Sequence, residues 1–173
     1  MITSENWMDE KLRRIKLIAF DFDGVFTDGK VIVREDGVES VVCSRKDTLR
    51  FSELKDAGVR LVVISKEGNP VVAKRCEKMG VGCFQGVDNK LDLLSKLILR
   101  EGVLWENVAY MGDDINDLPC LKLVGVAITV ADGDDKCIEV ANIITSRNGG
   151  NHAVREVCDL ILKAMLSKKG TDK

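Results

Sequence analysis

The sequence is poor in the residue patterns that build structural zinc sites. Among its 173 residues there is one histidine, His152, and the six cysteines form neither a C-x-x-C pair nor a cluster spaced with histidine. Structural zinc sites are usually assembled from such pairs, so the sequence argues against one. The cysteines are expected to be small, buried, reduced thiols.

Long apolar runs and a surplus of one charge are also missing. No stretch reaches 18 apolar residues, and the first 14 residues lack the apolar core of a signal peptide, so we expect no membrane span and a cytoplasmic location. The 26 Lys and Arg residues are spread along the chain and balanced by 28 Asp and Glu residues, which argues against a nucleic-acid partner. The length and composition are typical of one globular domain, residues 1–173.

Six short apolar runs predict the strands of a sheet. Most of them are apolar on both faces, which is typical of a parallel sheet covered by helices on both sides. Helical patterns lie between the runs, so the predicted fold class is α/β, with a Rossmann-like parallel sheet and no cap domain. The runs are residues 16–22, 59–65, 82–84, 107–112, 125–129 and 142–145.

Helix boundaries and a hairpin can be predicted from local signals. Asn69 followed by Pro70 is a typical helix start, and Gly102 is a typical helix end. An apolar stripe along 154–165 predicts the last helix. The β-rich runs on either side of Gly37 predict a protruding hairpin over residues 29–43. The lysine-rich segment 167–173 is expected to be disordered.

Carboxylates gather where the predicted strands end. "FDFDGVFTDG" places Asp21 and Asp23 directly after the first strand, and "GDDIND" follows the fourth. Ligands of open parallel sheets bind beyond the carboxyl ends of the strands, where Ser65 and Lys90 are also expected. Alone, the first motif could be an Asp-rich turn, Ser65 a helix cap and Lys90 a solvated lysine. Together they indicate an oxygen-ligated Mg²⁺ site that faces a phosphate site.

"DFDGVFTD", the serine of "VVIS", Lys90 and "GDDIND" resemble the four ordered motifs of the haloacid dehalogenase superfamily of phosphatases. The later "GGNHAVRE", residues 149–156, is similar to a segment of one capless branch. Members of that branch hydrolyse 3-deoxy-D-manno-octulosonate 8-phosphate, and close relatives act on 9-phosphates of nine-carbon, sialic-type acids. The resemblance therefore implies a Mg²⁺-dependent phosphatase that acts on a phosphorylated 2-keto-3-deoxy sugar acid.

The resemblance also implies a role for each motif residue. Asp21 would be the nucleophile that forms an aspartyl-phosphate, and Asp23 the general acid and base, with a partner that tunes its pKa. Ser65 and Lys90 would bind the transferring phosphoryl group. Mg²⁺ would be held by Asp21, the Asp23 carbonyl and Asp113. Asp114 and Asp117 would be further ligands or would support the ligands from behind, the second role being preferred for Asp117.

Departures from the branch pattern bear on the substrate. Residues 46–51, "KDTLRF", lack two glycines that octulosonate phosphatases usually have there, whereas "SKEGNPVVAKR", residues 65–75, is closer to the sialic-type relatives. These differences favour a nine-carbon acid slightly. His152 replaces a glycine of the branch, and it could face the substrate carboxylate or lie at the surface. The candidate substrate contacts are Asp47, Lys66, Glu67, Asn69 and Arg75.

A non-catalytic oligomerisation module, related to the phosphatase-like domain of CMP-sialic acid synthetases, is the alternative to an enzyme. Such a module has no need for the whole motif set, so the enzyme is preferred. A phosphomutase is disfavoured because no cap is inserted to exclude water. The hairpin is apolar on both faces and nothing in the sequence would cover it, which predicts packing between protomers. The resemblance implies a homotetramer.

Overall fold

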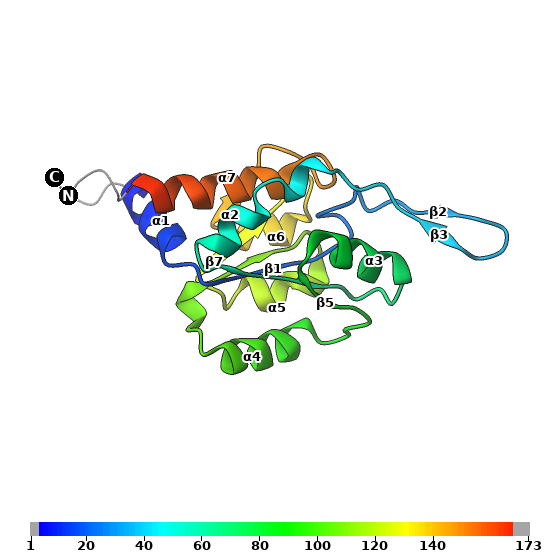
Figure 1. Ribbon diagram of the computed structural model, residues 1–173, viewed down its shortest axis with the longest axis horizontal. Helices are drawn as coiled ribbons and strands as arrows, with labels where there is room; N and C mark the ends of the chain where they lie inside the picture. Colours follow the sequence, from blue (N-terminus) through cyan, green and yellow to red (C-terminus); the bar gives the residue numbers. More distant parts are fainter. Residues whose placement is uncertain (1–3, 168–173) are drawn as a thin grey trace.

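The computed structural model describes residues 4–167, and a six-stranded sheet runs through its centre (Figure 1). The strands lie in the order β5-β4-β1-β6-β7-β8, and every neighbouring pair is parallel. The six apolar runs form these six strands, as predicted. Their bounds are β1 (Leu17–Phe20), β4 (Arg60–Ile64), β5 (Gly82–Phe84), β6 (Val108–Met111), β7 (Val126–Thr129) and β8 (Ile143–Ile144).

Helices cover both faces of the sheet, which confirms the predicted α/β class. One apolar cluster joins the sheet to α1 (Ser4–Arg13), α2 (Phe51–Asp56), α3 (Pro70–Met79) and α7 (Ala153–Leu166). The other joins it to α4 (Lys90–Glu101), α5 (Leu118–Leu121) and α6 (Asp135–Val140). In Figure 1, α7 and α2 lie above the sheet and α4 lies below it. Alternate residues of the inner strands, such as Leu17 and Ile18 of β1, therefore pack into two separate cores.

The local signals for helix ends act as predicted. The Asn69 side chain accepts a hydrogen bond from the backbone N–H of Val71 and so caps α3. Gly102 adopts the left-handed conformation, with φ of 64°, directly after α4. The stripe of α7 is buried at Val154, Val157, Cys158 and Ile161. Short 3₁₀ turns complete the connections: η1 (Lys46–Thr48), η2 (Trp105–Asn107) and η3 (Ile115–Asp117).

Helix α1 is an element that the sequence analysis did not predict. Its sequence is rich in charged residues, and its few apolar residues indicate a helix only when the element that they pack against is known. That element is α7, against which Leu12 is buried, while the Arg13 guanidinium donates a hydrogen bond to the carbonyl of Ala164 at 2.8 Å. Ser167 still contacts Arg13, and residues 168–173 of the predicted disordered tail lie outside the described residues.

The predicted hairpin is present and projects from the sheet. Strands β2 (Ile32–Val33) and β3 (Glu39–Ser40) pair antiparallel and extend away from the body of the molecule (Figure 1). Across the residues that the structure describes, no inserted domain stands over the carboxyl edge of the sheet. The same residues contain no helix that is long and apolar enough to cross a membrane.

Two loops that are far apart in sequence touch behind the carboxyl edge of β1. The backbone N–H of Gly150 donates to the carbonyl of Val25 at 3.0 Å. A Cβ atom added at Gly149 would lie 1.7 Å from the carbonyl oxygen of Gly24, far inside any real contact. The loop before α7 can therefore approach the loop after β1 only because residue 149 has no side chain.

We predict that Gly149→Ala lowers the free energy of unfolding by about 1–3 kcal/mol or more, because the added methyl group must push two backbone segments apart. Gly68→Ala is the matched control, since no atom lies within 4 Å of the position that its Cβ would occupy. Thermal or urea unfolding of both variants measures the effect. Equal stability of the two variants would show that the contact between the loops is not tight.

Candidate active site

The predicted site residues meet at the carboxyl edge of the sheet. β1 lies between β4 and β6, so Asp21, Ser65 and the 112–117 segment follow three adjacent strands. They surround an open cavity of about 570 Å³. Its lining consists of Asp21, Asp23, Gly24, Gly29, Ser65, Lys66, Glu67, Asp113, Asp114, Ile115 and Asn116.

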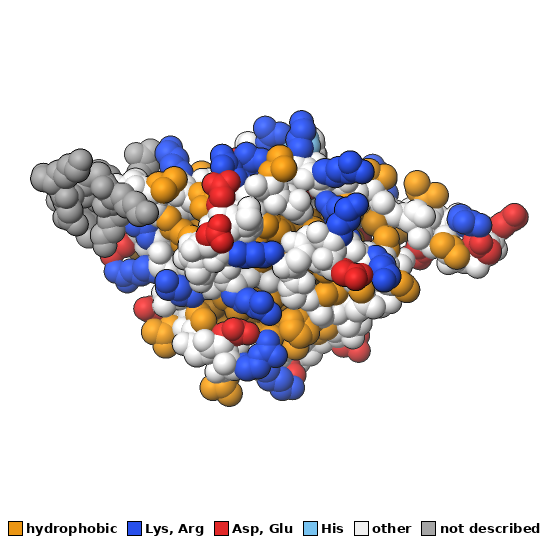
Figure 2. Space-filling view, viewed as in Figure 1, with side chains coloured by type: hydrophobic (Ala, Val, Ile, Leu, Met, Phe, Trp, Pro, Cys, Tyr) orange, Lys and Arg blue, Asp and Glu red, His pale blue; other side chains and the backbone are white. Residues whose placement is uncertain are grey.

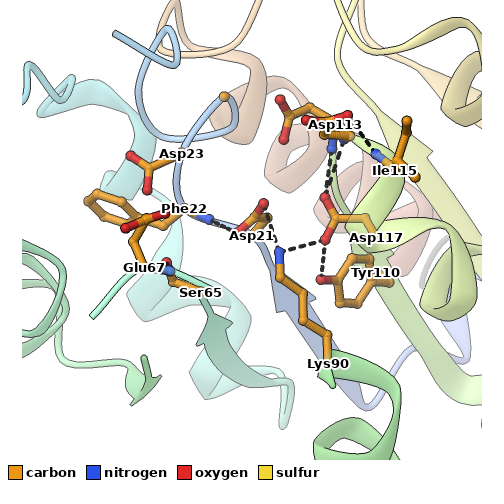
Figure 3. Close-up of polar contacts among 12 residues, drawn as sticks. Asp21, Phe22, Asp23, Ser65, Glu67, Lys90, Tyr110, Asp113, Ile115 and Asp117 are labelled. Carbon is orange, nitrogen blue, oxygen red and sulfur yellow. Dashed lines mark hydrogen bonds and ion pairs between the residues drawn. The ribbon is translucent and has the colours of Figure 1, made fainter. Parts of the chain in front are cut away.

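A buried ion-pair network closes the bottom of the site (Figure 3). Lys90, the first residue of α4, lies with its ammonium nitrogen 2.8 Å from Asp21 Oδ2 and 2.7 Å from Asp117 Oδ1. Lys90 and Asp117 are almost completely buried, and Asp21 is 6% exposed at the cavity. Burial alone would lower the pKa of Lys90, but the two carboxylates outweigh it and raise that pKa. The ammonium therefore stays charged.

Asp117 is held at both of its carboxylate oxygens. Oδ1 accepts the Tyr110 hydroxyl at 2.7 Å in addition to Lys90. Oδ2 accepts the backbone N–H groups of Asp113 at 3.1 Å and Asp114 at 3.4 Å. Asp114 in turn caps η3, because its side chain accepts the N–H of Ile115. Asp117 thus fixes the loop that carries Asp113.

The site has more negative than positive charge. Carboxylate oxygens of Asp21, Asp113 and Asp117 lie within 4.8 Å of one another and face one lysine, so the ionised set carries two excess negative charges. Burial and the charges of Asp117 and Asp114 raise the pKa of Asp113 to about 7. Burial and Asp117 raise the pKa of Asp21, against the opposing effect of Lys90.

This charge distribution fits a divalent cation with oxygen ligands. Oδ1 of Asp113 is buried and has no hydrogen-bond partner, so it is free to bind an ion. Gly24 makes room for this carboxylate, since a Cβ atom there would lie 1.9 Å from Asp113 Oδ2. Each oxygen of Asp117 already accepts two donors, whereas Asp113 and Asp21 face the cavity. The donor set therefore suits a hard ion such as Mg²⁺.

Asp23 is half-buried on the cavity wall beside Asp21. Burial raises its pKa, and the charge of Glu67 raises it further, while a hydrogen bond from Thr27 opposes both. The Thr27 hydroxyl donates to Asp23 Oδ1 at 3.4 Å, and Thr27 Oγ1 itself accepts the backbone N–H groups of Gly24 and Gly29. Glu67 is thus the neighbouring charge that adds to the effect of burial on the pKa of Asp23, and Thr27 fixes the loop.

Ser65 directly follows β4 and has its hydroxyl at the cavity. Only 1% of the residue is exposed, and Oγ accepts the backbone N–H of Glu67 at 3.2 Å. Because that bond uses a lone pair of Oγ, the hydroxyl proton is free to be donated to an anion in the cavity.

The candidate substrate contacts divide into two groups. Lys66 and Glu67 line the cavity, and Asn69 lines a smaller cavity of about 270 Å³ that shares Asp23, Gly29 and Glu67 with it. Asp47 and Arg75 line neither cavity. The Asp47 carboxylate is fully buried near the backbone N–H of Arg155 in the first turn of α7.

Three of the sequence candidates, Arg75, Asn69 and His152, make contacts within the protein that explain their positions. Arg75 donates to the carbonyl of Ser44 at 3.0 Å, which ties α3 to the segment after the hairpin. Asn69 donates to Glu39 on β3 in addition to capping α3. His152 lies before α7 in the left-handed conformation, with φ of 73°, beside Arg147 and outside the main cavity.

Thr27 and Tyr110 are site residues that sequence reasoning missed. Thr27 stands inside the first motif, but nothing in the motif distinguishes a threonine that organises a loop from one at the surface. Tyr110 is the only tyrosine of the chain and immediately precedes "MGDDIND", in a strand that is otherwise apolar. A single polar aromatic residue in such a strand was a usable signal.

Comparisons with known proteins agree with this geometry. Residues 84–157 match the family model of the haloacid dehalogenase-like hydrolases. The 3-deoxy-D-manno-octulosonate 8-phosphate phosphatase of Salmonella typhi is 36% identical over 155 residues, which cover 89% of this chain and 82% of that protein.

Solved structures give the same assignment. The Moraxella catarrhalis octulosonate phosphatase, solved with a magnesium ion, a phosphate ion and KDO, superposes with a TM-score of 0.89 at 35% identity, over 97% of this chain and 99% of that one. A subfamily III A hydrolase of Legionella pneumophila gives a TM-score of 0.91 at 33% identity, over 95% and 91% of the two chains. This protein therefore belongs to the haloacid dehalogenase-like hydrolases, in the family of the 3-deoxy-D-manno-octulosonate 8-phosphate phosphatases.

Proposed function

We propose that this protein is a Mg²⁺-dependent phosphomonoesterase that hydrolyses 3-deoxy-D-manno-octulosonate 8-phosphate. The observation that carries the proposal is the buried Lys90, held between Asp21 and Asp117 at the bottom of a cavity that also contains Asp113. A module that served only for assembly would have no reason to bury a lysine with these carboxylates at an open cavity. The family relationship supports the same activity.

Asp21 is the proposed nucleophile. Its Oδ1 accepts the N–H of Phe22 at 2.7 Å and its Oδ2 faces Lys90, so the carboxylate is fixed at the cavity surface. Attack of a carboxylate oxygen on phosphorus would form an aspartyl-phosphate as the bond from phosphorus to the sugar oxygen breaks. Water would then attack the same phosphorus and release Asp21 and inorganic phosphate. Lys90 and the Ser65 hydroxyl would contact the phosphoryl oxygens throughout.

Asp23 is the proposed general acid and base. It stands on the cavity wall, where the leaving sugar oxygen would emerge, and burial together with Glu67 favours its protonated form. The proton would pass to the sugar oxygen in the first displacement. The resulting carboxylate would accept a proton from the attacking water in the second. One side chain can serve both steps because the attacking water of the second displacement takes the position that the leaving sugar oxygen held in the first.

The carboxylates of Asp21 and Asp113 and the carbonyl of Asp23 would hold the Mg²⁺ ion. When bound, the ion would supply positive charge to the phosphoryl group and balance the carboxylates. Asp117 would hold the Asp113 loop rather than bind the ion, since its oxygens already have donors. Asp114 would act with it by capping η3.

Two of the three residues that favoured a nine-carbon substrate make structural contacts and no longer support that choice. Asn69 caps α3 and Arg75 holds the Ser44 carbonyl, so both have structural explanations that do not involve substrate. Only Glu67 of that group lines the main cavity. The Salmonella typhi and Moraxella catarrhalis relatives are octulosonate phosphatases, and we therefore place the eight-carbon acid first.

A panel of phosphorylated sugar acids tests this function. With Mg²⁺, we expect turnover of the eight-carbon 8-phosphate to exceed that of nine-carbon 9-phosphates, and excess chelator to abolish it. Asp21→Asn should reduce kcat to background while the variant remains folded, because the attacking charge is lost. Preference for a nine-carbon substrate would refute the substrate assignment alone. Turnover by purified Asp21→Asn would refute the mechanism.

We further propose that the protein is a homotetramer in which the hairpins of different protomers pack together. Valine and isoleucine side chains are exposed on β2 and on either side of β3, with Ile32 and Val33 more than 60% exposed and Val42 73% exposed. Figure 2 shows apolar side chains along the projecting hairpin. Val31 and Val41 at its base also line the smaller cavity beside Asp23. A packed neighbour would cover both the hairpin and the open side of the site.

Replacing residues 31–42 with a short Gly-Ser turn should give lower oligomers with poor turnover. Ile32→Ser combined with Val42→Ser should shift the assembly in the same direction, because the buried apolar area would shrink. Leu99→Ser is the matched control, since Leu99 is 83% exposed on α4, away from the hairpin. Light scattering measures the mass. A fully active monomer of the intact chain would contradict the proposal.

A further inference from the structure

Tyr110 carries a hydroxyl group in a part of the core that is otherwise apolar. Its side chain is fully buried in the cluster that joins the sheet to α4 and α5, among residues such as Leu94 and Leu121. Phenylalanine would fill nearly the same volume without a polar atom. A buried hydroxyl is costly unless it makes a good hydrogen bond, so its partner shows what it contributes.

That partner is the carboxylate oxygen that Lys90 also contacts. The Tyr110 hydroxyl donates to Asp117 Oδ1 at 2.7 Å, and the Lys90 ammonium donates to the same atom at 2.7 Å (Figure 3). The other oxygen of Asp117 is fixed by two backbone N–H groups of its own loop. Without the tyrosine hydroxyl, the only donor to Asp117 Oδ1 would be Lys90, whose long side chain is flexible.

The direction of the Lys90 ammonium follows from its two acceptors. An ammonium has three N–H donors and no acceptor, and Asp21 Oδ2 and Asp117 Oδ1 take two of the three. The tetrahedral geometry then fixes the direction of the third. Because Asp21 borders the cavity, a movement of Asp117 would turn this third donor relative to a phosphoryl group bound there.

We infer that Tyr110 is a positioning residue: its hydroxyl fixes Asp117 Oδ1 and thereby aims Lys90 at the phosphoryl group. This inference rests on the phosphatase function proposed above. Tyr110 itself touches neither the cavity nor the reacting atoms. Its effect should therefore appear in the chemical step and not in the binding of the sugar part of the substrate.

Tyr110→Phe tests the inference because it removes one oxygen atom and keeps the ring. We expect kcat to fall about tenfold, as for the loss of one hydrogen bond to a charged group, while KM changes less than about twofold. Val108→Ala is the matched control: Val108 lies two residues earlier in β6, buried in the same cluster and outside the site. It should lower the melting temperature and leave kcat unchanged.

The kinetic outcomes separate positioning from general destabilisation. Loss of kcat in Tyr110→Phe alone, measured well below both melting temperatures, supports the inference. An unchanged kcat in Tyr110→Phe would overturn it, and so would an equal loss of kcat in Val108→Ala. A rise in KM with constant kcat would also contradict a role in the chemical step.

Nitrogen-15 NMR of the Lys90 ammonium provides a readout that does not require activity. A buried ammonium held by two carboxylates should exchange its protons slowly and give a resolved signal in the wild-type protein. In Tyr110→Phe the signal should broaden or shift, whereas Val108→Ala should leave it unchanged. An identical Lys90 signal in wild type and Tyr110→Phe would overturn the inference. Absence of phosphatase activity in the wild type would instead refute the proposed function.

Discussion

Lys90 is almost completely removed from solvent, and Asp21 and Asp117 replace that solvent at 2.8 and 2.7 Å. Removing Lys90 would leave two buried carboxylates without their shared positive partner, at a cost of about 3–5 kcal/mol. The carboxyl ends of β1 and β6 and the start of α4 must therefore meet at one point. The network also leaves an excess of negative charge beside Asp113, which is the physical basis for expecting a divalent ion there.

Close backbone contacts bring the surrounding loops to this network. Gly24 lets the loop after β1 lie against the Asp113 carboxylate, and Gly149 lets the loop before α7 lie against Gly24. Thr27 then closes the first loop by accepting two backbone N–H groups with a single hydroxyl oxygen. Three segments that are distant in sequence thus hold one another behind Asp23, and the open side of the cavity is left to the substrate.

The sheet and the main helices could be predicted from sequence because their signals are local. Continuous apolar runs mark strands buried on both faces, and residues such as Asn69 and Gly102 mark helix ends through their own backbone chemistry. Helix α1 could not be predicted in this way, since its apolar residues are explained only by α7, which lies at the other end of the chain. The motif order placed Asp21, Ser65, Lys90 and Asp113 together because parallel strands end at a common edge.

What the sequence could not resolve were contacts that depend on tertiary packing. Asn69 and Arg75 fit a substrate-binding pattern, yet their polar atoms contact a helix end and a backbone carbonyl. The role of Tyr110 becomes visible only when Asp117 folds back to meet it, seven residues later in the chain. Similar residue patterns can therefore carry either a functional or a structural role, and the hydrogen-bond partners distinguish the two.

The stereochemical course at phosphorus tests the proposed role of Asp21 most directly. A substrate whose phosphoryl group is made chiral with sulfur and an oxygen isotope would be hydrolysed in water that carries another oxygen isotope. Two successive in-line displacements, through an aspartyl-phosphate, predict that the configuration at phosphorus is retained in the product. Inversion would mean that water attacks the substrate directly, and it would contradict the account.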